Sequence, residues 1–337
     1  MSLRLVEMIV PEIAAERASK SLGGQTVVGF WEQPIADQQV LVRVLLEAKR
    51  SESLLDSLEK DFSSVPGFRI MLWEVEATLP RLAQPEKADE GQQAGAAEQP
   101  QQIPLRISRE ELYSKIAAGA QVSHVFIVTV VLSLVAAIGL MRNDLAVIIG
   151  AMVIAPLLGP NVGLALATTL ADTVLTAKSL LANGVGVLTA LALSCFVGMV
   201  FAVDPAVPAI AARTSVGVGD VMLALAAGCA GALAFTTGVS ASLIGVMVAV
   251  ALLPPLVVFG LLLASGNFIL AGGALLLVLT NVISVNLAGV LTFVAQGIRP
   301  RTWWEADRAK TSTRKAIVLW LALLALLIVL IVVSAES

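Results

Sequence analysis

The chain has 337 residues, of which 57% are hydrophobic and only 14% are charged, a balance typical of membrane proteins. Its net charge is only -3, and the sequence has no basic stretch with interleaved aromatic residues, which argues against nucleic acid as a partner. Residues 1–115 hold 13 of the 22 basic and 18 of the 25 acidic groups, whereas Val221 to Ile298 contains none. The composition therefore predicts a polar N-terminal part followed by a membrane part.

Residues 1–80 have the pattern of a small soluble domain. Runs rich in Val, Leu and aromatic residues predict four strands, and apolar residues three or four apart predict two helices. The expected elements are a strand at 3–10, a helix at 12–22, strands at 26–31 and 40–46, a helix capped by Ser53 that runs to Phe62, and a strand at 68–75. This βαββαβ order is the ferredoxin-like arrangement, a fold that hosts many functions.

Residues 81–105 predict a disordered linker. The segment is crowded with Gln, Ala, Glu and Pro, and it cannot bury enough apolar surface to offset the entropy of ordering. Residues 106–118 predict a short juxtamembrane helix, and residues 119–337 predict the transmembrane domain.

Seven apolar segments follow, each near or above the roughly 20 residues that a helical crossing needs. They are expected at 119–140, 145–171, 177–203, 217–236, 240–264, 267–295 and 315–334. Arg and Lys gather before the first segment and between the sixth and seventh, at Gly297–Lys315, whereas the loops expected outside hold only Arg142 and Arg213. This pattern predicts a multi-pass protein of the cell inner (cytoplasmic) membrane, surrounded by the lipid bilayer, with a cytoplasmic N-terminus.

A proline-containing motif occurs twice in these segments. The copies run from Gly150 to Asn161 and from Gly245 to Pro255. Aligned from Ile149 and Ile244, seven of twelve positions are identical. Proline removes a backbone donor and clashes with the carbonyl four residues back, so we expect both helices to be broken. Three crossings separate the copies, which therefore run in opposite directions. This predicts two three-helix inverted repeats with a shared site near the membrane midplane.

The predicted pathway for a substrate or ion combines both motifs with polar residues of neighbouring segments. Asparagines at depth, including Asn183, can line a pathway or form ordinary interhelical hydrogen bonds. Freed carbonyls suit a cation and helix N-termini suit an anion, so the pattern leaves the sign of the ligand open. The expected pathway residues are Gly150, Met152, Pro156, Pro160, Asn161, Gly245, Met247, Pro254, Pro255, Asn281 and Asn286.

The sequence shows no constellation of catalytic residues. His124 is the single histidine, and Cys195 and Cys229 have no adjacent base and no metal-binding spacing. The carboxylates of the membrane part fall at predicted helix ends or loops, which argues against a carboxylate-driven proton pump. We therefore expect no enzyme activity, no metal site and no cofactor.

The run Arg142-Asn143-Asp144, followed by Val147 to Pro160, closely resembles the bacterial and archaeal family of hydrophobic membrane proteins called domain of unknown function 389. The later run Gly245 to Pro255, with Asn281 downstream, does so too. The resemblance covers most of residues 110–305, and the soluble part and last helix are similar to the longer members. It implies an integral membrane protein, and it implies no substrate or catalytic residue.

Two functions stay open from the sequence. One is a secondary transporter or channel-like pore for a small solute or ion, with its site between the two proline motifs. The other is a membrane-anchored signalling or scaffold protein whose N-terminal domain senses a ligand or partner. Glycine-rich helices also permit close subunit packing, which is compatible with a homo-oligomer.

Overall fold

The computed structural model describes residues 3–23, 27–75, 78, 107–237, 241–299 and 303–336. Within these ranges the side chains of Gly23, 241–251, 303–312, Leu330 and 332–336 are not described. The predicted linker lies outside the described residues. The chain divides into two compact units, Met1–Glu111 and Leu112–Ser337, and each is described by itself.

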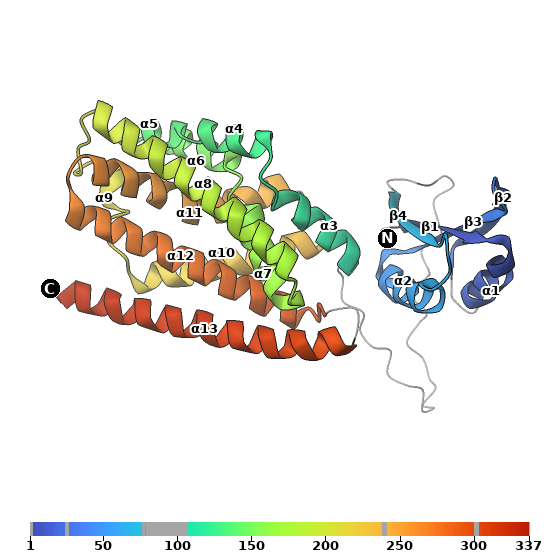
Figure 1. Ribbon diagram of the computed structural model, residues 1–337. Helices are drawn as coiled ribbons and strands as arrows, with labels where there is room; N and C mark the ends of the chain where they lie inside the picture. Colours follow the sequence, from blue (N-terminus) through green and yellow to red (C-terminus); the bar gives the residue numbers. More distant parts are fainter. Residues whose placement is uncertain are drawn as a thin grey trace, which may run out of the picture. The chain divides into compact units, whose positions relative to one another are not determined.

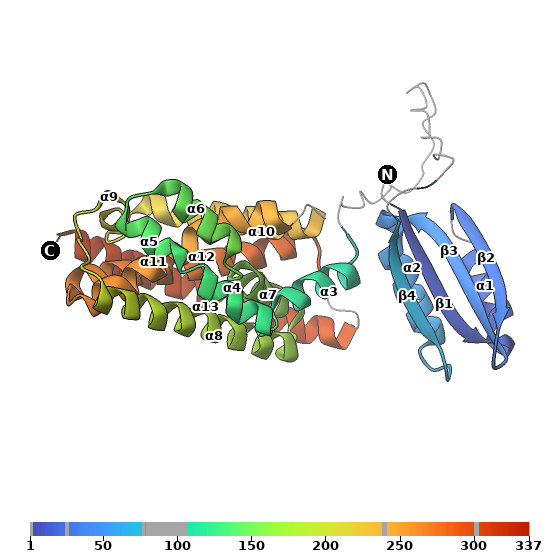
Figure 2. The same ribbon diagram turned by 90° about the horizontal axis from the view of Figure 1, so that it is seen from above.

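The first unit contains a four-stranded antiparallel sheet in the order β2-β3-β1-β4. Its elements are β1 (Leu3–Pro11), α1 (Glu12–Gly23), β2 (Gly29–Ile35), β3 (Gln39–Glu47), α2 (Ala48–Phe62) and β4 (Arg69–Val75). Both helices lie on the same side of the sheet (Figures 1 and 2). Buried and half-buried residues alternate along the central strands β1 and β3, as expected when one face packs on helices and the other is open.

The hydrophobic core of this unit lies between the helices and the sheet. Its largest members include Met8, Leu22, Leu46, Leu54, Leu58 and Phe62. The prediction that Ser53 caps the second helix is wrong, because α2 begins at Ala48 and the Ser53 hydroxyl donates to the Arg50 carbonyl inside the helix. Ala48 and Ser51 are buried in α2 together with Leu54, so tertiary packing extends the helix beyond the local capping signal.

The rest of the described chain is helical. The helices are α3 (Arg109–Gly119), α4 (His124–Leu132), α5 (Val135–Met141), α6 (Leu145–Ile154), α7 (Leu158–Leu170), α8 (Thr173–Val200), α9 (Pro208–Ala211), α10 (Val218–Thr237), α11 (Ala241–Ala264), α12 (Phe268–Ala295) and α13 (Trp303–Glu336). The long helices α8, α12 and α13 lie lengthwise in one bundle (Figures 1 and 2).

Several of these helices are suited to a membrane. Among the described residues, four helical stretches are long and apolar enough to cross one, and a fifth is added if the bent pair α6 and α7 counts as one span. The four stretches are His124–Met141, Thr173–Val200, Val218–Thr237 and Phe268–Ala295. The described helices thus provide four or five candidate spans.

Helix α8 shows why the bundle suits lipid. Large apolar side chains point outward from it, namely Leu180, Leu181, Leu188, Phe196 and Met199. Its buried side carries mostly small residues, namely Ser179, Ala182, Gly186, Ala190, Ser194 and Gly198. Small residues inside and large apolar residues outside are the arrangement expected when lipid surrounds the helices and close helix contacts hold them together.

The two proline motifs fold differently. The first motif breaks its helix: α6 ends at Ile154, Ala155 is extended with ψ 122°, and α7 is bent by 50° from α6. Proline disfavours a helical conformation at the residue before it, which explains the conformation of Ala155 before Pro156. The expectation of a second break is wrong, because α11 runs without interruption through Pro254 and Pro255.

The aligned sequences explain this difference. Pro156, where the first helix breaks, corresponds to Ala251 in the second copy, which keeps its N–H group. Pro255 corresponds to Pro160, which itself lies inside α7, in the first turn where a missing donor is tolerated. Around the second copy, Leu253 and Val257 are fully buried, so dense packing holds the chain in the helical conformation.

Candidate functional site

The break places the first turn of α7 against the end of α3. A side chain on Gly159 has no room: its Cβ would lie 2.8 Å from the carbonyl carbon of Gly119 and 3.1 Å from the Cα of Gly119. A Cβ on Gly163 would lie 3.0 Å from the Cβ of Ala120 and 2.6 Å from the hydroxyl oxygen of Ser179. Glycine at both positions therefore allows α3 and α8 to pack directly onto the start of α7.

Three asparagine side chains form a hydrogen-bonded chain just behind the break. The Asn286 amide nitrogen on α12 donates to Oδ1 of Asn161 on α7 over 3.0 Å. The Asn161 amide nitrogen donates in turn to Oδ1 of Asn183 on α8, also over 3.0 Å. Asn161 and Asn286 also donate to carbonyls of their own helices, those of Leu157 at 2.8 Å and Val282 at 2.9 Å. The asparagine chain thus links three helices across the bundle interior.

Two buried oxygen atoms, one in this chain and one beside it, have no hydrogen-bond partner among the described residues. They are Oδ1 of Asn286 and Oγ of Ser179, and both side chains are fully buried. Buried acceptors usually have a partner, so each of these oxygens is a place where a ligand or water can bind. The hydroxyls of Thr280 and Ser284 are also unpartnered, but they lie about 120–160° around α12 from Asn286 and belong to another helix contact.

The structure gathers some of the predicted pathway residues and separates others. Met152, Pro160, Asn161, Pro254, Pro255, Asn281 and Asn286 are buried, Pro156 is half-buried, and Gly150 is exposed. A Cβ on Gly150 would contact nothing within 4 Å, so this residue lies apart from the bundle interior. The side chains of Gly245 and Met247 lie outside the described residues, although their helix α11 contacts α6.

Asn281 and Asn286 have different positions on α12. They are five residues apart, which is about 140° around a helix, so they face different sides. Asn286 joins the asparagine chain, whereas no hydrogen bond joins Asn281 to Asn161 among those described. The buried Asn281 therefore belongs to a different contact of α12.

Other residues of the site were not among the predicted pathway residues. Asn183 was recognised only as a polar residue at depth, while Ser179, Gly119 and Gly163 were missed. The sequence does carry a signal for Ser179: small residues recur about every fourth position of α8, as Ser179, Ala182, Gly186, Ala190, Ser194 and Gly198. The contact of Gly119 with Gly159 has no such signal, because it depends on the tertiary position of α3.

A second polar contact fastens α3 to the turn between α7 and α8. The Tyr113 hydroxyl donates to Oδ2 of Asp172 over 2.7 Å, and Oδ1 of Asp172 accepts from the backbone N–H groups of Val174 and Leu175. Burial, helped by the hydrogen bond to the Asp172 carboxylate, raises the pKa of Tyr113 to about 12. Burial alone would raise the pKa of Asp172, but these hydrogen bonds and Lys178 hold it below its usual value.

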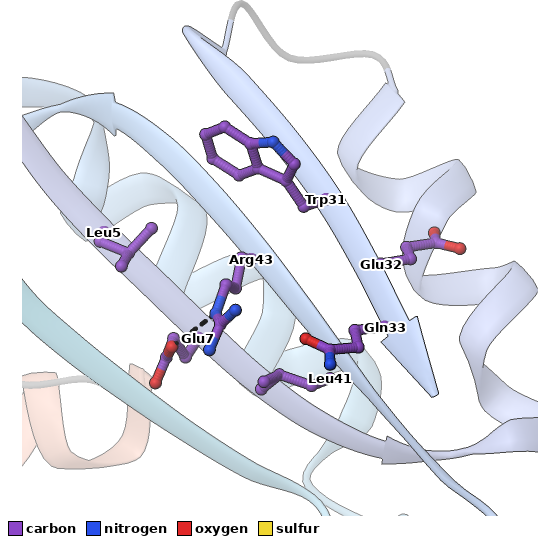
Figure 3. A pocket seen from close by; sticks show the side chains of 7 residues that line it. All are labelled: Leu5, Glu7, Trp31, Glu32, Gln33, Leu41 and Arg43. Atoms are coloured by element: carbon purple, nitrogen blue, oxygen red, sulfur yellow. Dashed lines mark hydrogen bonds and ion pairs between the residues drawn. The ribbon is translucent and has the colours of Figure 1, made fainter. Parts of the chain in front are cut away.

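The first unit has a candidate site of its own on the open face of the sheet (Figure 3). It is a shallow hollow of about 600 Å³ lined by Leu5, Glu7, Trp31, Glu32, Gln33, Leu41 and Arg43. Arg43 Nε donates to Glu7 Oε1 over 2.7 Å, and Trp73 Nε1 donates to Glu7 Oε2 over 3.1 Å. The hollow therefore offers a half-exposed Trp31 ring beside an ion pair.

The apolar helices and the polar chain at a helix break define a helical membrane protein with a small N-terminal α+β unit. The chain is 35% identical over 292 residues to an uncharacterised protein of Methanocaldococcus jannaschii, a match that covers 86% of this chain and 87% of that relative. The family model described as domain of unknown function (DUF389) matches residues 152–287. The chain belongs to this family, as the resemblance in its sequence implies. No solved structure matches it.

The match to the family model covers the candidate site. Residues 152–287 contain Pro156 at the break and all three members of the asparagine chain. Among the described residues, no group of three or more His, Cys, Asp or Glu side chains could hold a metal ion. The polar groups described at the break are the amides of Asn161, Asn183 and Asn286 and the hydroxyl of Ser179.

Proposed function

We propose that the protein is a secondary transporter or channel-like pore for a small solute or ion, and that its pathway passes the break between α6 and α7. The observation that carries the proposal is the chain Asn183–Asn161–Asn286 behind the break, in which the Asn286 oxygen has no partner among the described residues. Polar groups in the hydrocarbon region are costly and occur mainly where they face a bundle interior or an aqueous path.

The proposal includes seven crossings arranged as two inverted three-helix repeats. In two inverted repeats, α8 of the first half corresponds to α12 of the second half. The motif helices α7 and α11 should then both pack on α8 and α12. Both do: α7 and α11 each contact α8 and α12. The motif helices α6 and α11 also contact each other, which supports a shared site near the midplane.

The proposal also places the N-terminal unit in the cytoplasm of a cell with the protein in its inner membrane. The basic residues between Gly297 and Lys315 support this orientation through the positive-inside rule. We propose a ferredoxin-like fold for the unit, supported by the element order βαββαβ and the strand order β2-β3-β1-β4. No reaction chemistry is part of the proposed function.

A flux assay on the purified full chain in liposomes tests the pathway. Asn161→Leu removes the middle of the asparagine chain and should reduce uptake of the transported solute about tenfold or more, since it leaves Asn286 and Asn183 without their shared partner. Thr280→Val is the matched control, because it removes a buried polar group on another side of the same helix bundle. Equal uptake by both variants and the unchanged chain would rule out a pathway at the break.

The hollow on the sheet supports the alternative, a membrane-anchored protein whose N-terminal unit senses a ligand or partner. This alternative predicts that a small molecule bound in the hollow quenches the tryptophan fluorescence of the full chain. The substitution Trp31→Ala should abolish this quenching. It also requires that no ion or solute crosses liposomes that contain the folded protein. The two functions therefore differ in a measurable property of the same preparation.

A further inference from the structure

The break has two helix ends of opposite polarity, and only one of them is available to a ligand. A helix N-terminus carries partial positive charge and a C-terminus carries partial negative charge, because their backbone N–H and C=O groups lack helical partners. The end of α6 and the start of α7 meet at the break. The sign of a ligand depends on which of these ends the protein leaves uncovered.

The positive end, the start of α7, packs closely against the end of α3. The backbone of Gly119, at the C-terminal end of α3, lies directly against Gly159 in the first turn of α7. The C-terminal carbonyls of α3 carry partial negative charge, so they complement the positive end of α7. Pro160 has no N–H group, which removes one further donor from this turn. The end of α3 and the missing N–H group of Pro160 therefore make this end less favourable for an anion.

The negative end, the last turn of α6, retains an acceptor. Ala155 N–H donates to the Ala151 carbonyl, but the next carbonyl, that of Met152, would pair with the nitrogen of Pro156, which has no hydrogen. The Met152 side chain is buried, so this carbonyl does not lie on the outer surface of α6. The end of α6 thus provides partial negative charge in the interior.

The asparagine chain adds a second acceptor. The Asn286 amide nitrogen donates two hydrogen bonds, to Asn161 and to Val282, while its own oxygen accepts none from the described residues. Donating hydrogen bonds shifts electron density toward the amide oxygen, and successive bonds in a chain reinforce one another. Oδ1 of Asn286 is therefore a strengthened acceptor that is fully buried.

The acceptors are neutral, which limits the charge of the ligand. The sequences of α6, α7 and α12 contain no Asp, Glu, Lys, Arg or His, and Lys178 on α8 is exposed. Ca²⁺ and Mg²⁺ are usually held by carboxylates, whereas neutral carbonyl oxygens coordinate monovalent cations in selective pores. The double charge of a divalent cation would also be costly to bury without a counter-charge.

We infer that the ligand of the proposed pathway is a monovalent cation of the size of sodium or potassium, coordinated in part by Oδ1 of Asn286. The inference rests on the proposed function and extends it, because it assigns the sign and the size of the charge of the ligand that passes the break. Two observations carry it: Oδ1 of Asn286 is buried without a partner among the described residues, and the end of α3 packs at Gly119 against Gly159 at the start of α7.

The test uses the full chain in liposomes of phosphatidylethanolamine and phosphatidylglycerol, with uptake of radiolabelled sodium, rubidium and chloride measured side by side. The unchanged protein should take up sodium or rubidium at least tenfold faster than chloride. Melting of the detergent-purified protein provides an independent measure: sodium or potassium chloride should raise the Tm above that in choline chloride at equal ionic strength.

Asn286→Leu should reduce cation uptake about tenfold and abolish the cation-dependent rise in Tm, because it removes the acceptor. Thr280→Val, the matched control on α12, should leave both unchanged. Size-exclusion chromatography checks that each variant is folded, and the ion selectivity of the unchanged protein decides the question if Asn286→Leu does not fold.

The outcomes separate the inference from the proposed function. Chloride uptake that is lost on Asn161→Leu would overturn the cation assignment and leave the pathway at the break intact. Uptake of no ion, together with no rise in Tm with sodium or potassium, would overturn the cation assignment and leave an uncharged solute as the ligand of the proposed pathway. Cation uptake that survives Asn286→Leu in folded protein would remove Asn286 from the site.

Discussion

Two copies of one sequence motif fold into a broken helix in one half of the membrane unit and a continuous helix in the other. Both copies contain two prolines, so the number of prolines does not determine the break. The position does: Pro156 follows an Ala155 that turns to an extended conformation, whereas the corresponding Ala251 continues α11. Proline breaks a helix only where packing also allows the preceding residue to leave the helical region.

The functional consequence is an asymmetric site. The broken copy contributes Asn161, which joins the asparagine chain, and the Met152 carbonyl, to which Pro156 cannot donate a helical hydrogen bond. The helix of the continuous copy, α11, contributes a densely packed wall of buried residues, including Leu252, Leu253, Leu256, Val257 and Val258. The two halves therefore contribute differently: the first supplies the break with Asn161 and Asn183, and the second supplies Asn286 and the packed helix α11.

The largest expected effect comes from moving the break into the continuous copy. Ala251→Pro places proline where the first copy has Pro156, and it should destabilise the protein by about 3 kcal/mol or more, because α11 loses a helical hydrogen bond within a packed segment. Pro255→Ala, which restores a donor to the same helix, should not lower stability. Thermal melting in detergent measures both, and an unchanged Tm for Ala251→Pro would contradict the importance of position.

The contact of α3 with the broken copy should be nearly as sensitive. Gly159→Ala places a Cβ into the backbone of Gly119 and should cost about 1–3 kcal/mol through overpacking. Gly150→Ala is the matched control in α6, because its Cβ would meet nothing within 4 Å, and alanine is the better helix former. Similar melting temperatures for the two variants would show that α3 does not pack on Gly159.

Removing the break itself should affect flux more than stability. Pro156→Ala restores a donor for the Met152 carbonyl and favours one continuous helix, so uptake through the proposed pathway should fall about tenfold, or about 1.4 kcal/mol. Pro254→Ala, in the helix that is already continuous, should leave uptake nearly unchanged. Equal loss in both variants would mean that the two copies contribute equally.

The smallest effect concerns Tyr113, the single tyrosine of the chain, whose ionisation is therefore visible in the tyrosinate absorbance. Its pKa of about 12 exceeds the ordinary value of about 10, so its stabilising contribution is present below pH 10 and is lost as the pH rises through 12. Tyr113→Phe should cost about 0.5–1.5 kcal/mol. Asp172→Asn should lower the pKa of Tyr113, and an absorbance midpoint near pH 10 in the unchanged protein would contradict the contact.

Much of the fold follows from local sequence, because local rules determine it. Strands β1, β3 and β4 match the expected ranges within one residue, whereas β2 (Gly29–Ile35) begins and ends later than the strand expected at 26–31. Each expected apolar segment contains helix. The start of α2 differs because the burial of Ala48 and Ser51 outweighs the capping signal of Ser53. Proline content alone suggested two breaks, but the conformation of the residue before each proline depends on packing.

The candidate site was only partly predictable for a related reason. Pro156, Asn161 and Asn286 could be chosen because polar and helix-breaking residues at depth are unusual. The pairing of Asn286, and not Asn281, with Asn161 depends on how α12 is rotated toward α7, which no local pattern specifies. The covering of Gly159 by Gly119 depends on the path of α3, which the sequence describes only as a short juxtamembrane helix.

The most direct test of the central claim, that the end of α6 faces a polar interior, compares two neighbouring residues. Met152 is buried, whereas Val153 is about half exposed on the outer surface of the bundle, where lipid is proposed to lie. Each is replaced by Cys in a background without Cys195 and Cys229, and the proteoliposomes are treated with a cationic, membrane-impermeant thiol reagent that reacts only in water. We expect Met152→Cys to react and Val153→Cys to remain unmodified; modification of Val153→Cys with no reaction at Met152→Cys would contradict a polar pathway at the break.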